Sequence, residues 1–196
     1  MLVLASASPR RQELLRNAGI PFVVQATDIL ELPREGENPR ACAERLAREK
    51  ARAVFRQRPD DFILGADTIV TVDGQILGKP RDVADAARML GLLSGRTHQV
   101  TTGVCLLGPR LGTADRELRT GFEDTRSETT LVAIRALSDD EIRSYVATGE
   151  PMDKAGAYAI QGIASRWISR IEGDYFNVVG LPVALVYRML REHGAF

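Results

Sequence analysis

The hydrophobic and polar positions at the start of the chain change from a strand pattern to a helix pattern. Residues 2–5 are apolar and predict a short strand, and a helix is predicted from Pro9 to the residues just before Gly19. Ser8 is a good N-cap, proline suits the first helical position, and glycine commonly ends a helix. The sequence therefore predicts a strand, a loop of small residues and a helix within its first 19 residues.

The strongest hairpin signal in the chain is the dipeptide Asp73-Gly74, which lies between two runs rich in β-branched residues. This dipeptide favours the tight turn that joins antiparallel strands. A two-residue turn here predicts that Thr68 lies opposite Lys79. The pattern places Asp67 and Lys79 in one neighbourhood, but an ideal register puts them on different faces, so no contact is predicted.

The rest of the pattern alternates helices and strands without repeats, low-complexity tracts or a clear linker. Residues 109–120 are polar and rich in turn formers, which predicts the exposed tip of a long hairpin. The mixture favours an α/β fold with a mixed, twisted sheet flanked by helices, in a single domain over residues 1–196. Further helices are expected over residues 37–58, 82–95, 138–149 and 181–194, and further strands over residues 20–27, 97–108, 128–137 and 165–173.

Composition and charge exclude several classes of protein. The chain has 196 residues with 26 basic and 26 acidic side chains, so its formal net charge is zero. A general nucleic-acid-binding surface is not expected, because such domains usually carry a clear basic excess. No run reaches the length and apolarity of a membrane-spanning helix, and we expect a cytoplasmic protein without membrane partners.

The cysteines and the internal histidine suggest no metal chemistry. Cys42 and Cys105 both fall in apolar or helical patterns and lack the paired spacing of a zinc site, so buried free thiols are expected. His98 is a lone histidine in a strand pattern and favours a structural role.

Two arginines occupy an unfavourable place at the start of the first predicted helix. Arg10 and Arg11 lie at the positive end of the helix dipole, where each exposed cation costs roughly 0.3–1 kcal/mol. One explanation is that both side chains extend into water. The alternative is that backbone N–H groups and two guanidinium groups converge on one phosphate.

Asp67 interrupts a run that otherwise suits a buried strand. A buried carboxylate is costly unless it is paired or binds a metal. A carboxylate at a strand end in water, or one bonded to Thr68, would be the structural alternative. Gly65 and Ala66 leave room for a close approach before it.

Other candidates are individually weak and gain meaning together. Lys50 lies in a highly charged helix, Glu31 in an acidic loop, and Gln161 between two glycines, and each of these positions also suits a solvent-exposed side chain. No nucleophilic serine–histidine or cysteine–histidine arrangement is evident. Carboxylates bind hard cations such as Mg²⁺, and lysines and arginines bind phosphate. The set is suited to metal-assisted attack of water on a phosphate chain.

Seven segments spread along the chain together resemble the Maf family of nucleoside triphosphate pyrophosphatases. The resemblance extends from Leu2 to the last predicted helix, in the order of the family. The segments are LASASPRRQELL, LAREKA, LGADTIV, GKPRD, LSGRTHQVTTGV, YAIQG and VVGLP.

The resemblance implies a fold similar to that of inosine triphosphate pyrophosphatases, with two lobes around a cleft. It implies hydrolysis of a nucleoside triphosphate to the monophosphate and pyrophosphate with a divalent cation, Mg²⁺ or Mn²⁺, and it is compatible with a homodimer. Asp67 would accept a proton or hold the metal, and Glu31, in the least well matched block, would help to hold the metal. Residues that would bind the triphosphate are Ser8, Arg11, Lys50 and Lys79.

The subfamily implied is that of the dTTP/UTP pyrophosphatases. Its members carry arginine after the SP step, threonine after the GAD step and glutamine in the IQG step, and these are Arg10, Thr68 and Gln161 here. A side-chain amide can both donate to and accept from the base edge of uracil or thymine. The expected enzyme is a housekeeping hydrolase of dTTP, UTP and related modified pyrimidine nucleotides. The alternative function is a regulatory nucleotide-binding protein that restrains septum formation, with incidental hydrolysis.

Overall fold

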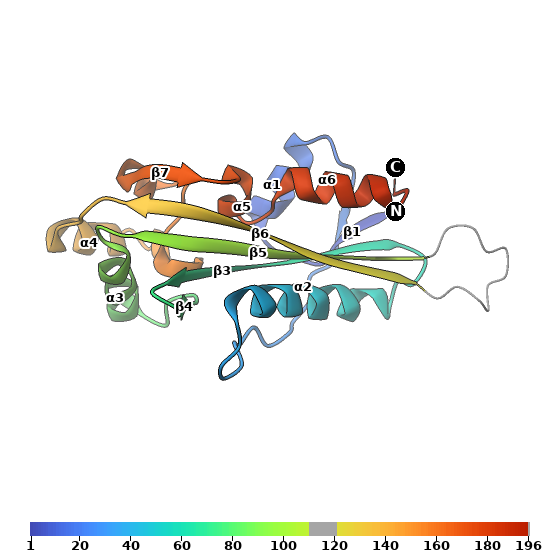
Figure 1. The fold of residues 1–196 in the computed structure, drawn as a ribbon, viewed down its shortest axis with the longest axis horizontal. Coiled ribbons are helices and arrows are strands. Elements are labelled where there is room, and N and C mark those ends of the chain that lie inside the picture. Colours follow the sequence, from blue (N-terminus) through green and yellow to red (C-terminus); the bar gives the residue numbers. More distant parts are fainter. Residues whose placement is uncertain (110–120, 196) are drawn as a thin grey trace. The chain divides into compact units, whose positions relative to one another are not determined.

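The computed structural model describes residues 1–109 and 121–195, which form one mixed sheet with helices packed against it (Figure 1). This confirms the predicted α/β class. The predicted hairpin tip at residues 109–120 lies, apart from Pro109, outside the described residues. The strands are β1 (Leu2–Leu4), β2 (Val23–Val24), β3 (Phe62–Val72), β4 (Gln75–Leu77), β5 (Thr97–Gly108), β6 (Phe122–Ile134) and β7 (Ile168–Glu172).

Helices and short 3₁₀ turns connect these strands. The α-helices are α1 (Pro9–Asn17), α2 (Pro39–Phe55), α3 (Val83–Leu93), α4 (Asp139–Val146), α5 (Tyr175–Val179) and α6 (Val183–Glu192). The 3₁₀ helices are η2 (Glu150–Asp153), η3 (Ala155–Ala157) and η4 (Ile163–Trp167).

The described strands pair in the order β2-β1-β3-β5-β6-β7, and β4 pairs with β3. Strand β1 runs parallel to both β2 and β3, whereas the β3–β4 and β6–β7 pairs are antiparallel, so the sheet is mixed as predicted. Val72 lies opposite Gln75, which confirms the predicted two-residue turn, and both turn residues have positive φ. The β3–β4 pairing ends at Leu77, before Lys79 is reached.

The chain divides into two compact units. Unit 1 comprises Met1–Asp67, Thr102–Glu128 and Gly180–Phe196, and unit 2 comprises Thr68–Thr101 and Thr129–Val179. Strands β3, β5 and β6 each contain residues of both units. That residues 1–196 act as one domain stays a prediction.

Unit 1 has a core of small and branched apolar side chains. Its helix α2 packs an apolar face against the sheet, and Figure 1 shows α2 on one side of the strands, with α1 and α6 on the other. The predicted caps Ser8 and Asn38 both accept backbone N–H bonds at the starts of α1 and α2. The core cluster contains Val3, Ala5, Ala47, Ala51, Val54, Ile63, Cys105 and Leu107.

Unit 2 has a larger core that includes aromatic side chains. Tyr145 and Trp167 are almost fully buried and pack edge to face, with ring centroids 5.1 Å apart. Helix α4 begins with a capping box, in which Ser138 and Glu141 bond each other's backbone N–H. His98 is buried and its Nε2 lies 2.7 Å from the Tyr158 hydroxyl, in agreement with the structural role expected for it.

Several element boundaries differ from the sequence prediction. The strand predicted over residues 20–27 is wrong in extent: only the two exposed valines of β2 pair. Strand β6 begins at Phe122, six residues before the predicted start, because ion pairs neutralise the charged side chains of its first half.

Two further boundary errors lie in unit 2. Residues 163–167 form η4 and not the predicted strand start, and this turn brings Trp167 into the core. Helix α5 was not predicted because five residues are too short for a visible period. It begins where the Asp174 side chain accepts the N–H of Phe176.

Candidate active site

Two glycines allow α2 to pack unusually close to the sheet. A Cβ atom on Gly65 would lie 2.1 Å from the backbone oxygen of Ala47, and one on Gly103 would lie 2.4 Å from the backbone of Ala43. Any larger residue at these two positions would collide with the backbone of α2. The two strand glycines and the alanines that face them on α2 therefore set the distance between the helix and the sheet. Side chains alternate along a strand, so Asp67, two residues after Gly65, points to the same face.

That face carries a buried lysine between two carboxylates. The Nζ atom of Lys50 lies 2.6 Å from Oδ1 of Asp67 and 2.6 Å from Oε1 of Glu31. The side chains of Lys50 and Asp67 are 6% and 9% exposed, whereas that of Glu31 is 39% exposed. The structure therefore brings three predicted site residues into contact, with one side of the cluster open to water.

The first turn of α1 lies within electrostatic reach of this cluster. Burial lowers the pKa of Arg11 from its ordinary value, the carboxylates of Asp67 and Glu31 act in the opposite direction, and Arg10 lowers it further. The predicted conflict between the arginines and the helix dipole is real, since the first turn of α1 has no acidic residue. The nearby carboxylates partly offset it.

Arg11 also has a structural attachment that the sequence did not predict. Its Nε donates to the carbonyl oxygen of Gly180 at 2.8 Å, and its Nη1 donates to Oγ of Ser6 at 3.1 Å. Ser8 caps the helix by accepting the N–H of Arg11 at 3.5 Å. Gly180 lies in the VVGLP segment, which was recognised as a motif but not as the partner of Arg11.

Two carboxylates of this cluster could serve as ligands of a divalent cation. The described residues contain no group of three or more histidine, cysteine or acidic side chains that could hold a metal. However, Mg²⁺ is commonly held by one or two carboxylates together with phosphate oxygens and water. The two carboxylates of Asp67 and Glu31 converge on a single cation, Lys50, and therefore fit a metal whose remaining ligands come from a phosphate substrate.

Three other predicted site residues belong to unit 2. Thr68 follows Asp67 in β3, Lys79 follows β4 and is exposed, and Gln161 is exposed between η3 and η4. The N–H of Gly156 donates to the carbonyl oxygen of Gly78 at 3.1 Å. This bond holds the segment before Gln161 against the residue before Lys79, so the structure places these two predicted regions side by side within unit 2.

The loop that carries Gln161 is anchored at its far end by Glu150. The Glu150 carboxylate accepts the N–H of Ile163 at 3.1 and 3.2 Å and the hydroxyl of Tyr145 at 2.8 Å. A Cβ atom on Gly162 would lie 2.1 Å from Oε1 of Glu150, so a larger residue next to Gln161 would displace this carboxylate from its present place. The sequence offered one signal for this geometry, the glycines flanking the amide.

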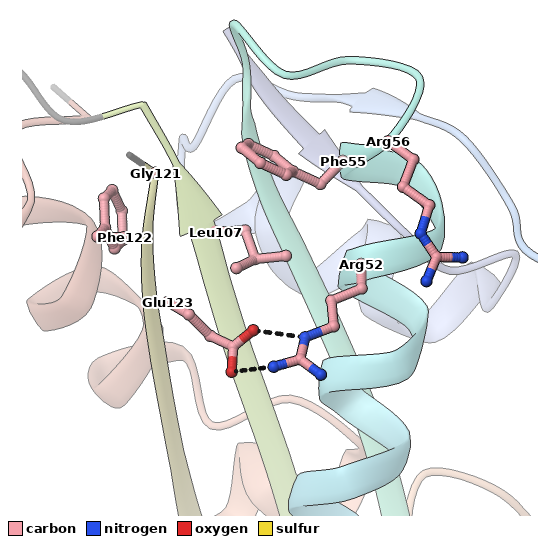
Figure 2. Close-up of a pocket in the computed structure, with 7 residues that line it drawn as sticks. All are labelled: Arg52, Phe55, Arg56, Leu107, Gly121, Phe122 and Glu123. Atoms are coloured by element: carbon pink, nitrogen blue, oxygen red, sulfur yellow. Dashed lines mark hydrogen bonds and ion pairs between the residues drawn. The ribbon is translucent and has the colours of Figure 1, made fainter. Parts of the chain in front are cut away.

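Three further observations concern the cysteines, the helices and a surface pocket. Cys42 and Cys105 are free and buried, as predicted, and burial raises the pKa of each thiol to about 11. In residues 1–109 and 121–195 there is no helix with the length and apolarity needed to cross a membrane. The pocket in Figure 2 contains no predicted site residue; its lining is Arg52, Phe55, Arg56, Leu107, Gly121, Phe122 and Glu123.

Comparison with known sequences gives strong matches over almost the whole chain. A family model described as "Maf-like protein" matches residues 1–193. A dTTP/UTP pyrophosphatase of Koribacter versatilis is 57% identical over 193 residues, which are 98% of this chain and 94% of that protein. A dTTP/UTP pyrophosphatase of Symbiobacterium thermophilum is 53% identical with the same coverage.

Comparison with solved structures gives a weaker but equally extended match. The structure of the Staphylococcus aureus Ham1 protein superposes with a TM-score of 0.50 at 15% sequence identity, covering 97% of this chain and 98% of that one. At this identity the likeness concerns the fold, and it agrees with the predicted α/β architecture.

Proposed function

We propose a function from one premise: the chain belongs to the Maf family. The protein hydrolyses dTTP and UTP to the nucleoside monophosphate and pyrophosphate, by attack of water on the α-phosphate. The names of its relatives at 57% and 53% identity support this substrate choice. A nucleoside triphosphate substrate also favours a cytoplasmic location.

The observation that carries the proposal is the contact of Lys50 with Asp67 and Glu31, 2.6 Å on each side. A buried lysine held by carboxylates next to Arg11 is suited to bind a polyanion, because each cation can exchange a carboxylate for a phosphate oxygen. Lys50, Arg11, Ser8 and Lys79 bind the triphosphate in this proposal.

Asp67 acts as the proton acceptor. Its carboxylate is fixed by the buried ammonium group and can take a proton from the attacking water, a role that typically contributes 10²–10⁴-fold to a rate.

Glu31 and Asp67 would hold the divalent cation. A metal ion at these oxygens would act as a Lewis acid and offset charge on the phosphates. Chelation with EDTA is expected to abolish turnover, and added Mg²⁺ or Mn²⁺ is expected to restore it. Full activity in excess EDTA would remove the metal from the proposal.

Base selectivity is assigned to Arg10, Thr68 and Gln161. The exposed amide of Gln161 has both a donor and an acceptor, which match the N3–H and O4 edge of uracil and thymine.

We also propose a homodimer, which light scattering after size-exclusion chromatography would detect as twice the 21.5 kDa chain mass.

The test is incubation with Mg²⁺ and, separately, dTTP, UTP, CTP, ATP, GTP and 7-methyl-GTP, followed by identification of the products. Thymidine or uridine monophosphate with pyrophosphate is the expected result. Release of orthophosphate instead would mean cleavage at another phosphate, and no turnover of any nucleotide would favour the regulatory alternative.

A further inference from the structure

The two leucines that flank Glu31 do not fix its loop by apolar packing. It connects β2 to α2 and contains neither helix nor strand between residues 25 and 38. Leu30 and Leu32, on either side of Glu31, are 78% and 59% exposed. Another interaction must therefore keep the Glu31 carboxylate beside Lys50.

Arg45 on α2 supplies such an interaction. Its Nη2 donates to the carbonyl oxygen of Leu32 at 3.0 Å, directly after Glu31 in the chain. Its Nε and Nη2 also donate to the two carboxylate oxygens of Glu37 at 2.6 and 2.7 Å, and Nη1 donates to Glu49 at 3.2 Å. One guanidinium group thus bonds the loop both just after Glu31 and near its end.

The Arg45–Glu37 pair is well shielded from water. Both side chains are only 12% exposed, and the bidentate geometry is the strongest that an arginine makes with a carboxylate. The hydrogen bond from Arg45 lowers the pKa of Glu37 from 4.5 to about 2, so Glu37 stays charged even at pH values where an ordinary glutamate is protonated. The Glu37 carboxylate also accepts the N–H of Arg34 at 3.1 Å, which tightens the turn at the end of the loop.

We propose that Arg45 is a positioning residue for the metal site: through Leu32 and Glu37 it fixes the loop so that Glu31 meets Asp67 and Lys50. This inference rests on the proposed function, in which Glu31 holds a divalent cation. Arg45 and Lys50 lie five residues apart on α2, a rise of about 7.5 Å. A single rigid helix therefore sets both the loop backbone and the group that its carboxylate contacts.

A second bidentate pair on the same helix provides a control, with a more exposed arginine: the Arg52 side chain is 55% exposed and that of Arg45 12%. Arg52, further along α2, forms a bidentate pair with Glu123 of β6 at 2.7 and 2.9 Å (Figure 2). Arg52→Met and Arg45→Met remove the same kind of interaction from the same helix, but only Arg45→Met releases the Glu31 loop. General damage to α2 would affect both variants.

The first measurement is the affinity of the nucleotide-free protein for Mn²⁺. Binding is monitored through the loss of the electron paramagnetic resonance signal of free Mn²⁺. Arg45→Met is expected to weaken binding about tenfold, the lower end of the effect of removing a group that orients a metal ligand. Arg52→Met is expected to bind as the wild type does, and Arg45→Lys, which keeps the charge but not the bidentate geometry, should lie between them.

The second measurement is the Mg²⁺ dependence of dTTP hydrolysis. For Arg45→Met the half-maximal Mg²⁺ concentration should rise about tenfold, while kcat at saturating Mg²⁺ stays within about twofold, because the reacting groups themselves are intact. Equal Mn²⁺ affinity and Mg²⁺ dependence in Arg45→Met and wild type would overturn the inference, as would equal losses in Arg45→Met and Arg52→Met.

A fourth variant keeps the test decisive if Arg45→Met does not fold. Glu37→Gln retains a hydrogen-bond acceptor and removes the charge, and it is expected to weaken Mn²⁺ binding about threefold; no change would overturn the inference. A wild-type protein that binds Mn²⁺ without hydrolysing any nucleotide would refute the proposed function, and the Mn²⁺ measurement would still decide the role of Arg45.

Discussion

The two compact units of this chain bury polar groups in different ways. Unit 1 buries Arg11, Lys50 and Asp67 close to one another, so its buried charges face other charges. In unit 2 most of the buried polar groups in the described residues are neutral, and the buried carboxylate Asp85 pairs with exposed arginines at the start of α3.

Buried ion pairs contribute little to stability, because the cost of removing charges from water often exceeds their attraction. A cluster such as that of unit 1 is therefore better explained by chemistry than by folding. Unit 2 follows the opposite principle: its core of aromatic and aliphatic side chains supports an exposed loop with one amide, Gln161. Substitutions in the charged cluster of Lys50, Asp67 and Glu31 in unit 1 should consequently affect turnover most, and substitution of Gln161 in unit 2 should affect selectivity most.

The largest effect is expected for Asp67→Asn. The amide keeps the size of the side chain but cannot accept a proton at neutral pH, so kcat for dTTP should fall about 10³-fold. Pyrophosphate release measures the loss, and circular dichroism with thermal melting verifies that the fold is retained. A variant that keeps more than about a tenth of the wild-type rate would exclude Asp67 as the proton acceptor.

Replacing a glycine by alanine should have opposite effects on stability in the two units, because Gly65 is closely packed and Gly91 faces open space. Gly65→Ala in unit 1 forces a Cβ to 2.1 Å from the Ala47 backbone oxygen, so we expect a loss of about 3 kcal/mol in the free energy of unfolding. Gly91→Ala, in the middle of α3 in unit 2, meets nothing within 4 Å and should stabilise by about 0.5–1 kcal/mol. Urea unfolding measures both, and two changes of the same sign would contradict the close packing of α2.

The pH dependence of stability should reveal His98 in unit 2. Burial lowers the pKa of His98 from 6.5 to about 4, so between these values the unfolded chain binds a proton that the folded chain does not. The free energy of unfolding therefore has its full value above pH 6.5 and falls by about 3 kcal/mol as the pH drops to 4.

Urea unfolding at pH 7, 6, 5 and 4.5 measures this slope. His98→Gln should flatten it, whereas Tyr158→Phe, which removes the hydroxyl partner and keeps the imidazole, should not. An unchanged slope in His98→Gln would assign the effect to other groups.

The starts of α1 and α2 in unit 1 and the β3–β4 turn in unit 2 were predicted well from the sequence because their signals are local. Proline and a polar cap start α1 and α2, and the Asp73-Gly74 turn fixes the β3–β4 register. Asp67 was found because a carboxylate in an apolar run is anomalous. Glu37 and Arg45 were missed because each is an ordinary charged residue in the sequence. Their contact with each other depends on how the loop before α2 folds back onto that helix.

The irregular parts of unit 2 were harder to predict for a different reason. Residues 150–167 fold through three short 3₁₀ turns, which have no periodic pattern, and their course is determined by tertiary contacts such as the Glu150 carboxylate with the N–H of Ile163. Gln161 could be identified as a candidate from its glycine neighbours. The attachment of its loop to Glu150 could not be predicted, because it depends on the same tertiary contacts.

The smallest effect, and the sharpest test of unit 2, is expected for Gln161→Ala. Because the side chain is exposed, the melting temperature should not change by more than about 2 °C, while kcat/KM for dTTP should fall about tenfold through the loss of hydrogen bonds to the base. The rate with 7-methyl-GTP, whose base edge differs, should not fall in parallel. Gln99→Ala, which removes an exposed amide from β5 of the same unit, is the matched control and should leave both nucleotides unaffected. If Gln161→Ala lowers turnover of both nucleotides equally, the amide serves the reaction and not the choice of base, and the division of roles between the two units fails.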